Sequence, residues 1–127
     1  MIKILAVALG GAIGSTGRYL TSLAVESFSN SRFPYETLAA NLIGCFLIGL
    51  LWGYFERLTI SNEFRLFLFT GVLGGYTTFS TFARENIQFF KTGEPVSAMS
   101  YILVSNLIGL SLVAVGFLIS THLIHSN

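Results

Sequence analysis

The chain has 127 residues, of which 53% are hydrophobic and 10% are charged, and its formal net charge is +1. A soluble domain carries about 25% charged residues, so this composition excludes an ordinary soluble domain and predicts an integral membrane protein. The single cysteine, Cys45, excludes an intrachain disulfide and a cysteine-built metal site, and we expect no nucleic-acid partner.

Four apolar segments account for nearly the whole sequence, because about 20 apolar residues are needed to cross the hydrocarbon of a bilayer. We expect one all-α membrane domain over residues 1–127, with transmembrane helices at about 4–25, 37–55, 64–90 and 96–121. The connections between them are short, which leaves no room for a soluble domain. The start of the sequence lacks a small-residue cleavage site followed by a polar region, which a secretory signal peptide would have. We therefore expect it to be part of the first helix.

The first two segments carry small residues four positions apart. Ala6, Gly10 and Gly14 repeat in the first, and Asn41 begins such a row in the second. Small faces let helices approach closely in lipid, where no hydrophobic force brings helices together. The amide of Asn41 needs partners in a dry interior. It is either an interhelical hydrogen-bonding group or a donor that lines a pore.

The third segment contains a glycine pair near the midpoint of an uncharged run over residues 66–83. We expect the helix to break at 74–78, close to the middle of the membrane. Main-chain groups exposed by such a break must be satisfied by protein, water or an ion, because lipid cannot satisfy them. Unwound carbonyls are groups by which broken helices coordinate Na⁺.

Two phenylalanines, Phe79 and Phe82, follow this break among the hydroxyl residues of 77–81. Residues three apart on a helix lie on nearly the same face. An aromatic ring has a positive edge, so rings that present their edges can stabilise a small anion. The alternative is that the rings of Phe79 and Phe82 merely face lipid. The fourth segment begins after Pro95, a residue suited to a first helical turn.

The two sides of the membrane carry nearly equal numbers of basic residues. One side has Lys3, Arg57 and Arg65, and the other has Arg32, Arg84 and Lys91, with Arg18 lying toward it. Orientation follows a Lys/Arg bias between short loops, and almost none is present. We therefore expect copies to insert in both orientations and to form an antiparallel two-fold homodimer.

These features together resemble the CrcB/Fluc family of fluoride channels. The resemblance covers all four segments, and its most specific mark is the run Gly-Gly-Tyr-Thr-Thr-Phe-Ser-Thr-Phe at 74–82. Further marks are Gly10-Gly11, Gly14, Arg18-Tyr19, Thr37-Leu38, Asn41 and Gly44. The resemblance implies a passive, fluoride-selective channel in a prokaryotic-type plasma membrane, with fluoride, lipid and a second copy of the chain as partners.

The resemblance also implies roles for individual residues. A structural Na⁺ at the dimer interface would be held by the main-chain carbonyls of Gly74 and Thr77. Arg18 corresponds to a vestibule charge, although pairing with Glu26, Glu85 or a helix C-terminus is equally consistent. Some relatives have a serine where this chain has Gly109. The full anion pathway implied is Asn41, Phe79, Phe82, Ser80, Thr81, Tyr101, Ser105, Glu85 and Arg18.

Three other classes of protein compete with the channel. A small dual-topology multidrug or cation exporter needs a mid-membrane carboxylate, whereas the first segment has Arg18 and no acid before Glu26. A non-conducting scaffold subunit would explain the glycines but leaves the hydroxyl and aromatic residues unused. An enzyme is not expected, because His122 and His125 lie at the C-terminal end and no arrangement of catalytic residues is visible.

Overall fold

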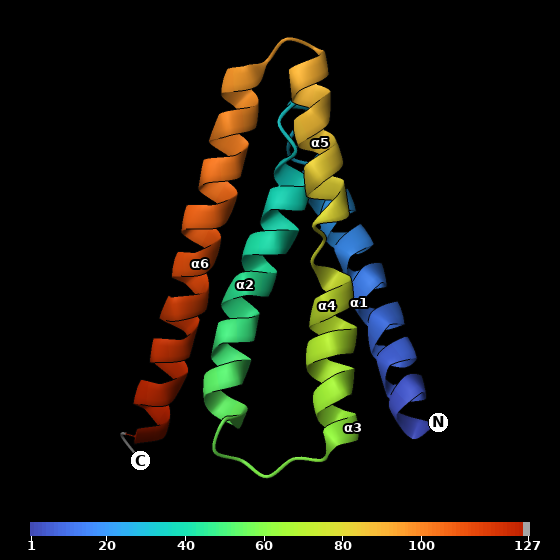
Figure 1. Cartoon of the computed structure of the whole chain (residues 1–127), viewed down its shortest axis with the longest axis vertical. Helices are drawn as coiled ribbons and strands as arrows, with labels where there is room; N and C mark the ends of the chain where they lie inside the picture. The colour runs from blue at the N-terminus through green and yellow to red at the C-terminus, as the bar shows by residue number, and fades with distance from the viewer. Residues whose placement is uncertain (126–127) are drawn as a thin grey trace.

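Every regular element in the computed structural model, which describes residues 1–125, is a helix. Three segments are continuous helices: α1 (Ile2–Glu26), α2 (Tyr35–Phe55) and α6 (Pro95–His125). The third segment along the chain consists of α3 (Asn62–Arg65), η1 (Leu66–Leu73), α4 (Gly74–Tyr76) and α5 (Ser80–Lys91). The four segments run along the long axis of the molecule (Figure 1). The N-terminus, the α2–α3 connection and the C-terminus lie at one end, and the other two connections lie at the opposite end.

Three of these segments are long and apolar enough to cross a membrane: Tyr35–Phe55, Asn62–Lys91 and Pro95–Ile124. The chain is therefore an all-α, multi-pass membrane protein, as its composition predicted. Helix α1 does not reach the same hydropathy, because it carries several glycine and hydroxyl residues and the charge of Arg18. The fourth span remains a prediction, and the last two residues of the expected domain lie outside the described part of the chain.

The helices associate as two close pairs. Helix α2 packs along α6, and α1 packs along η1 and α4 (Figure 1). Glycines at the contacts explain the proximity: a Cβ on Gly116 would lie 2.9 Å from the main-chain nitrogen of Leu50, and one on Gly14 would lie 2.9 Å from that of Tyr76. The contacts between the two pairs are sparse by comparison, so space remains between α2 and the third segment.

A small aromatic core closes one end of the molecule. Phe89 of α5 and Tyr101 of α6 are buried there, and Phe33 and Phe82 pack against them. The rings of Phe33 and Tyr101 are 5.3 Å apart and nearly perpendicular, an arrangement that aromatic quadrupoles favour. This core anchors α5 and α6 to the connection that precedes α2.

The third segment departs from an ordinary α-helix twice. Residues 66–73 form a π-helix, a wide-turn geometry that is rare and often found at functional sites. The helix then continues through Gly74 and Gly75 and ends at Tyr76, after which Thr77 is extended with φ −88° and ψ 157°. The expected interruption at 74–78 is thus corrected to 77–79.

The packing of the glycine pair explains why the helix continues further than expected. A Cβ on Gly75 would lie 2.9 Å from the main-chain oxygen of Gly11 and 3.2 Å from its Cα. Gly75 is therefore required for the close approach of α1 and not for unwinding. The interruption is instead produced by side chains from neighbouring helices, described below.

Candidate functional site

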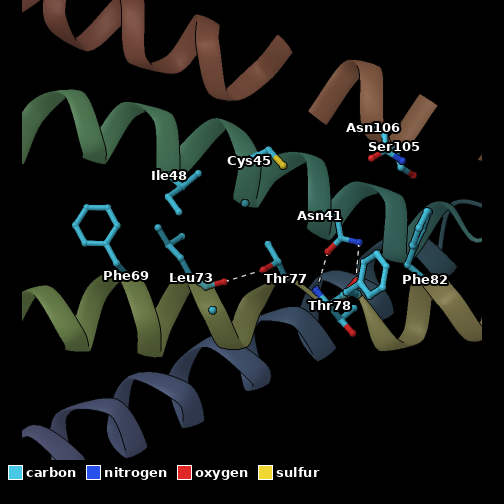
Figure 2. Close-up of a pocket in the computed structure, with 13 residues that line it drawn as sticks. Asn41, Cys45, Ile48, Phe69, Leu73, Thr77, Thr78, Phe82, Ser105 and Asn106 are labelled. Atoms are coloured by element: carbon cyan, nitrogen blue, oxygen red, sulfur yellow. Dashed lines mark hydrogen bonds between the residues drawn. The ribbon is translucent and has the colours of Figure 1, made fainter. Parts of the chain in front are cut away.

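A cavity of about 360 Å³ lies beside the interrupted helix. Its walls come from α2, from the third segment on both sides of the interruption, and from α6 (Figure 2). Most of the wall is apolar, and its polar side chains are those of Asn41, Thr77, Thr78, Ser105 and Asn106. A largely apolar pocket with a few convergent polar groups is the usual form of a small-ligand site.

The side chain of Asn41 forms hydrogen bonds with the main chain inside the interruption of the third segment. Its Nδ2 donates to the main-chain oxygen of Thr78 at 3.0 Å, and its Oδ1 accepts from the main-chain nitrogen of Thr78 at 2.8 Å (Figure 2). One amide thus satisfies both main-chain groups of a residue outside any helix. Asn41 is an interhelical hydrogen-bonding group, one of the two roles left open by the sequence. Asn41 also lines the cavity, and its amide group has a second N–H in addition to the one that bonds Thr78.

Hydroxyl groups cluster immediately after the interruption. The Thr78 hydroxyl donates to Thr81 Oγ1 at 3.2 Å and lies 3.4 Å from Ser80 Oγ. Thr78 Oγ1 also accepts from the main-chain nitrogen of Thr81 at 3.3 Å, so it caps the first turn of α5 in the manner of a helix N-cap. The sequence predicted Ser80 and Thr81 as site residues but did not assign this central position to Thr78.

The predicted aromatic residues lie next to these hydroxyls. The rings of Phe79 and Phe82 are 5.7 Å apart, and both residues line the cavity. Phe79 is 78% exposed in the single chain, which leaves its ring accessible from outside. Phe82 meets the buried ring of Tyr101 at 4.8 Å with an angle of 65°. The aromatic pair is therefore supported from α6 on one side only.

Glu85 connects three helices. Its Oε1 accepts from the Tyr101 hydroxyl at 3.0 Å, and its Oε2 accepts from the Thr37 hydroxyl at 3.1 Å. Thr37 was not predicted as a site residue, although it precedes Asn41 by one helical turn and therefore shares its face. The sequence contained this signal, but the partner on α5 became visible only in the fold.

Ser105 and Gly109 continue along α6. The hydroxyl oxygen of Ser105 is enclosed and has no hydrogen-bond partner within residues 1–125. Its neighbour Asn106 also lines the cavity, with Nδ2 donating to the main-chain oxygen of Ile102 at 2.8 Å. Gly109 is buried where a Cβ would lie 3.4 Å from Cys45 Sγ. Gly109 therefore lies at the contact between α2 and α6.

Arg18 lies apart from the other predicted pathway residues. Its Nε donates to the main-chain oxygen of Gly75 at 3.3 Å, and it is not part of the cavity wall. Among the pairings considered from the sequence, the one with a helix C-terminus is observed, because α4 ends at Tyr76. A cation at this position also interacts favourably with the helix dipole.

The main-chain oxygens at the interruption divide into two groups. Those of Leu73, Gly75 and Thr78 accept hydrogen bonds from Thr77, Arg18 and Asn41, respectively. Those of Gly74 and Thr77 accept none from the described residues. Gly74 is exposed, and a Cβ there would have only the Phe69 oxygen, at 3.5 Å, as a near neighbour. The two carbonyls predicted as cation ligands therefore accept no hydrogen bond from the described residues.

A second cavity has a volume of about 610 Å³. The two cavities share Ile48 and Phe69 in their walls. The wall of the second also includes Lys3, Asn62 and Arg65. Two of the residues in the wall of the second cavity, Lys3 and Arg65, are therefore basic.

Comparison with known proteins gives one consistent answer. The family described as "CrcB-like protein, Camphor Resistance (CrcB)" matches residues 5–117. A protein of Desulfotalea psychrophila named "Fluoride-specific ion channel FluC" is 56% identical over 120 residues, which are 94% of this chain and 93% of the relative. Proteins with the same name from Flavobacterium psychrophilum and Salinibacter ruber are 43% and 44% identical, over 97% and 91% of this chain and 100% and 87% of their own length.

Proposed function

Because this chain belongs to the CrcB-like family, we propose that it is a fluoride-specific ion channel that lets cytoplasmic fluoride leave down its electrochemical gradient. The protein is a multi-pass membrane transport protein and not an enzyme, which in a bacterium places it in the plasma membrane. The observation that carries the proposal is the clamp of Asn41 on Thr78, which exposes hydroxyls and two rings beside one cavity.

The chemistry of this cavity suits a small anion. Fluoride is strongly hydrated, so a pathway must replace its water with hydrogen-bond donors. The amide of Asn41 and the ring edges of Phe79 and Phe82 in the cavity wall would provide such groups. The hydroxyls of Ser80 and Thr81, which neighbour the wall residue Thr78, would add to them. None of them carries a full positive charge, which keeps binding weak enough for release, a requirement for conduction.

The pathway continues from these groups toward Glu85. Tyr101 and Ser105 supply hydroxyls along α6, and the enclosed Ser105 oxygen has its proton available. Glu85 is an acceptor in this arrangement, since it takes hydrogen bonds from Tyr101 and Thr37. It positions the Tyr101 side chain at one end of the pathway.

The functional unit we propose is an antiparallel homodimer of oppositely inserted copies. The exposed ring of Phe79 and the exposed main chain of Gly74 lie where a second chain can cover them. A two-fold axis through the interruption brings two copies together at one depth, with the third helix of each broken near the middle of the membrane. The nearly equal distribution of basic residues supports insertion in both orientations.

A structural Na⁺ on the two-fold axis fits the residues present. The unpartnered carbonyls of Gly74 and Thr77 from two chains would provide four oxygen ligands, and main-chain oxygens of broken helices are known ligands of Na⁺. Such an ion would neutralise main-chain dipoles between the two copies. The carbonyls of Gly75 and Thr78 already accept hydrogen bonds from Arg18 and Asn41, respectively.

The alternative exporter is not favoured. Its transport cycle requires a carboxylate that takes up a proton and a cationic drug in turn. The carboxylate nearest the cavity is Glu85, and both of its oxygens accept hydrogen bonds from α2 and α6. Between Lys3 and Glu26, the charged side chain of α1 is instead the cation Arg18, which donates to the Gly75 carbonyl.

We expect purified protein in liposomes loaded with potassium fluoride to release fluoride when an ionophore makes potassium permeant. Liposomes loaded with potassium chloride should retain their chloride under the same conditions, and protein-free liposomes should retain both anions. A fluoride electrode and a chloride electrode measure the two effluxes. Folded protein without fluoride efflux would exclude the channel, and proton-driven cation uptake would indicate the exporter.

Dual insertion gives a separate prediction. Replacing Arg32 and Lys91 by glutamine removes positive charge from one side, and replacing Lys3 and Arg57 removes it from the other. Each double variant alone should insert mainly in one orientation and lose most of its fluoride efflux, whereas co-expression of the two should restore it. Sidedness is measured by labelling a cysteine placed in a loop. Full activity of a singly oriented population would exclude the antiparallel dimer.

A further inference from the structure

Two cavities outside the interruption share a pair of wall residues, Lys3 and Leu66. One is the second cavity described above, whose wall comes from α1, α2, the third segment and α6. The other is a third cavity, of about 380 Å³, lined by Lys3, Ile4, Val7, Ala8 and Leu66. Because Lys3 and Leu66 belong to both walls, the two cavities adjoin at these residues.

The walls of both cavities are mostly apolar. In the third cavity every wall residue except Lys3 is apolar. The apolar residues of the second cavity are Ile48, Trp52, Leu66, Phe69 and Val113, and its polar residues are Lys3, Asn62, Arg65 and Thr70. Two apolar hollows thus meet beside a basic residue, and a second basic residue lines the larger of them.

We propose that the two cavities together bind one anionic phospholipid, with its phosphate at Lys3 and Arg65 and one acyl chain in each cavity. This lipid site is separate from the anion pathway and does not depend on whether the chain conducts fluoride. In the antiparallel dimer proposed above, each leaflet would contain one such site.

Neither basic side chain has an anionic partner within residues 1–125. No ion pair or hydrogen bond joins the ammonium group of Lys3 or the guanidinium group of Arg65 to another described residue. Glu63 lies two positions before Arg65, a spacing at which side chains of a helix do not face each other, and it is part of neither wall. Two cations in one wall repel each other, whereas a phosphate attracts both and offers them charge-assisted hydrogen bonds.

The two basic residues lie where the headgroup of a lipid would be. Lys3 is in the first turn of α1, and Arg65 is the last residue of α3. The beginning of α1 and helix α3 lie at the same end of the molecule (Figure 1). From Arg65 the wall continues to Phe69, further along the apolar span 62–91. Basic pockets between transmembrane helices are known to bind anionic headgroups, and the apolar wall beyond suits an acyl chain.

Trp52 is the third residue that favours a lipid. It lies near the C-terminal end of α2, where its ring packs on Phe117 with the ring centroids 4.3 Å apart. Its indole N–H donates to no other described residue, and 48% of the residue is exposed. Tryptophan is enriched at the level of lipid headgroups, because its ring is apolar and its N–H finds a polar acceptor there.

A second copy of the chain is the competing occupant of these cavities. Protein that covered them would remove Lys3 and Arg65 from the headgroup region, and burial of a charge is costly unless a partner group pairs with it. Neither wall contains a carboxylate. An anionic lipid instead leaves both cations at the membrane surface and neutralises them there.

Trp52 also supplies the measurement, because it is the single tryptophan of the chain. The protein is reconstituted into vesicles of phosphatidylcholine and phosphatidylglycerol, in which either the first or the second lipid carries brominated acyl chains. Bromine quenches tryptophan fluorescence on contact, so the two quenching curves give the preference of the site for the anionic lipid. Both leaflets have the same composition, so the orientation of the protein does not affect the result.

We expect Trp52 to prefer phosphatidylglycerol by about 30-fold, since each basic residue near a membrane surface strengthens the attraction about five-fold. Lys3→Gln and Arg65→Gln should each lower the preference about five-fold, and the double variant should nearly abolish it. Lys91→Gln is the matched control, because Lys91 is an exposed basic residue in the last turn of α5 and is part of neither wall. It should retain the wild-type preference.

High salt provides a second readout that needs no variant. Screening weakens interactions between exposed charges, so the preference of the wild-type protein should fall as the salt concentration rises. A preference that is unchanged at high salt would overturn the assignment of the phosphate to Lys3 and Arg65. Circular dichroism and size exclusion confirm that each variant is folded before its quenching is compared.

The other results would each overturn the lipid site. Equal quenching by the two lipids in the wild type would mean that Trp52 contacts only ordinary surrounding lipid. Quenching by neither lipid would mean that a second copy covers the cavity. A preference that survives in the double variant would exclude Lys3 and Arg65 as the headgroup ligands. Displacement of the lipid by soluble glycerol phosphate would indicate a phosphate site without acyl chains. Fluoride efflux enters none of these comparisons, so their failure would leave the proposed channel function standing.

Discussion

Asn41→Ala is expected to reduce fluoride efflux by about 100-fold. The substitution removes both hydrogen bonds to the main chain of Thr78, and no backbone partner replaces them while Thr77 stays extended. Leaving a buried donor or acceptor unsatisfied costs about 1–3 kcal/mol for each group, so the native interruption loses about 2–6 kcal/mol. The expected loss of efflux corresponds to about 2.7 kcal/mol, in the lower part of that range.

We expect Asn41→Ala to lower fluoride efflux much more than it lowers the fraction of folded protein. The helix pairs α1–η1 and α2–α6 do not depend on Asn41, so the variant should remain a membrane-inserted helical protein by circular dichroism. The matched control is Asn30→Ala, which removes an amide from the exposed loop before α2 and should leave efflux at the wild-type rate. Wild-type efflux from Asn41→Ala would mean that the clamp on Thr78 is not required for conduction.

Gly14→Ala is expected to lower the free energy of unfolding by about 3 kcal/mol, the upper part of the range for overpacked interiors. A Cβ at this position would overlap the main-chain oxygen of Val72 and lie 2.9 Å from the nitrogen of Tyr76. Both neighbours are main-chain atoms, which cannot move aside as a flexible side chain can. Helix α1 would have to move away from η1 and α4.

That displacement should also affect the site, because Arg18 and Thr21 lie on α1 one and two turns after Gly14. Their hydrogen bonds to Gly75 and Tyr76 would lengthen, and we expect lower fluoride efflux per folded protein. Unfolding in a denaturant series in detergent measures the stability, and efflux normalised to folded protein measures the effect on the site.

Gly11→Ala provides a sharp control for this prediction. Gly11 is three residues earlier on the same helix, yet a Cβ there would meet nothing within 4 Å. Alanine favours a helix interior by about 1 kcal/mol relative to glycine, so stability should be unchanged or slightly higher. If Gly11→Ala and Gly14→Ala lowered the free energy of unfolding equally, the effect of Gly14→Ala would not come from the close contact between helices.

The glycines of the 74–82 run show how far the sequence could be interpreted. The sequence predicted this run as the centre of the site, because a glycine pair followed by hydroxyls and rings is unusual within an apolar segment. The position of the interruption was wrong by a few residues. Glycine permits unwinding but does not require it, and here Gly75 provides contact with Gly11 while Asn41 of another helix decides where the main chain leaves the helix.

Side-chain partners were the least predictable part of the site. Glu85 was predicted from the resemblance, but its hydrogen bond to Thr37 joins residues 48 positions apart. The bond between Thr21 and Tyr76 spans 55 positions. Hydropathy and small-residue spacing describe one helix at a time, so they carry no information on which faces of two helices meet.

The sequence by itself determined that this protein is a helical membrane protein, and it predicted where the working residues cluster along the chain. Both conclusions follow from local properties, namely the length of apolar segments and the residue types within one segment. Only the tertiary structure decided that the helix ends at Tyr76, that Arg18 holds the Gly75 carbonyl, and that the carbonyls of Gly74 and Thr77 accept no hydrogen bond from the described residues. These features depend on how α1 and α2 pack against the third segment, because a main chain outside a helix takes its direction from the side chains around it.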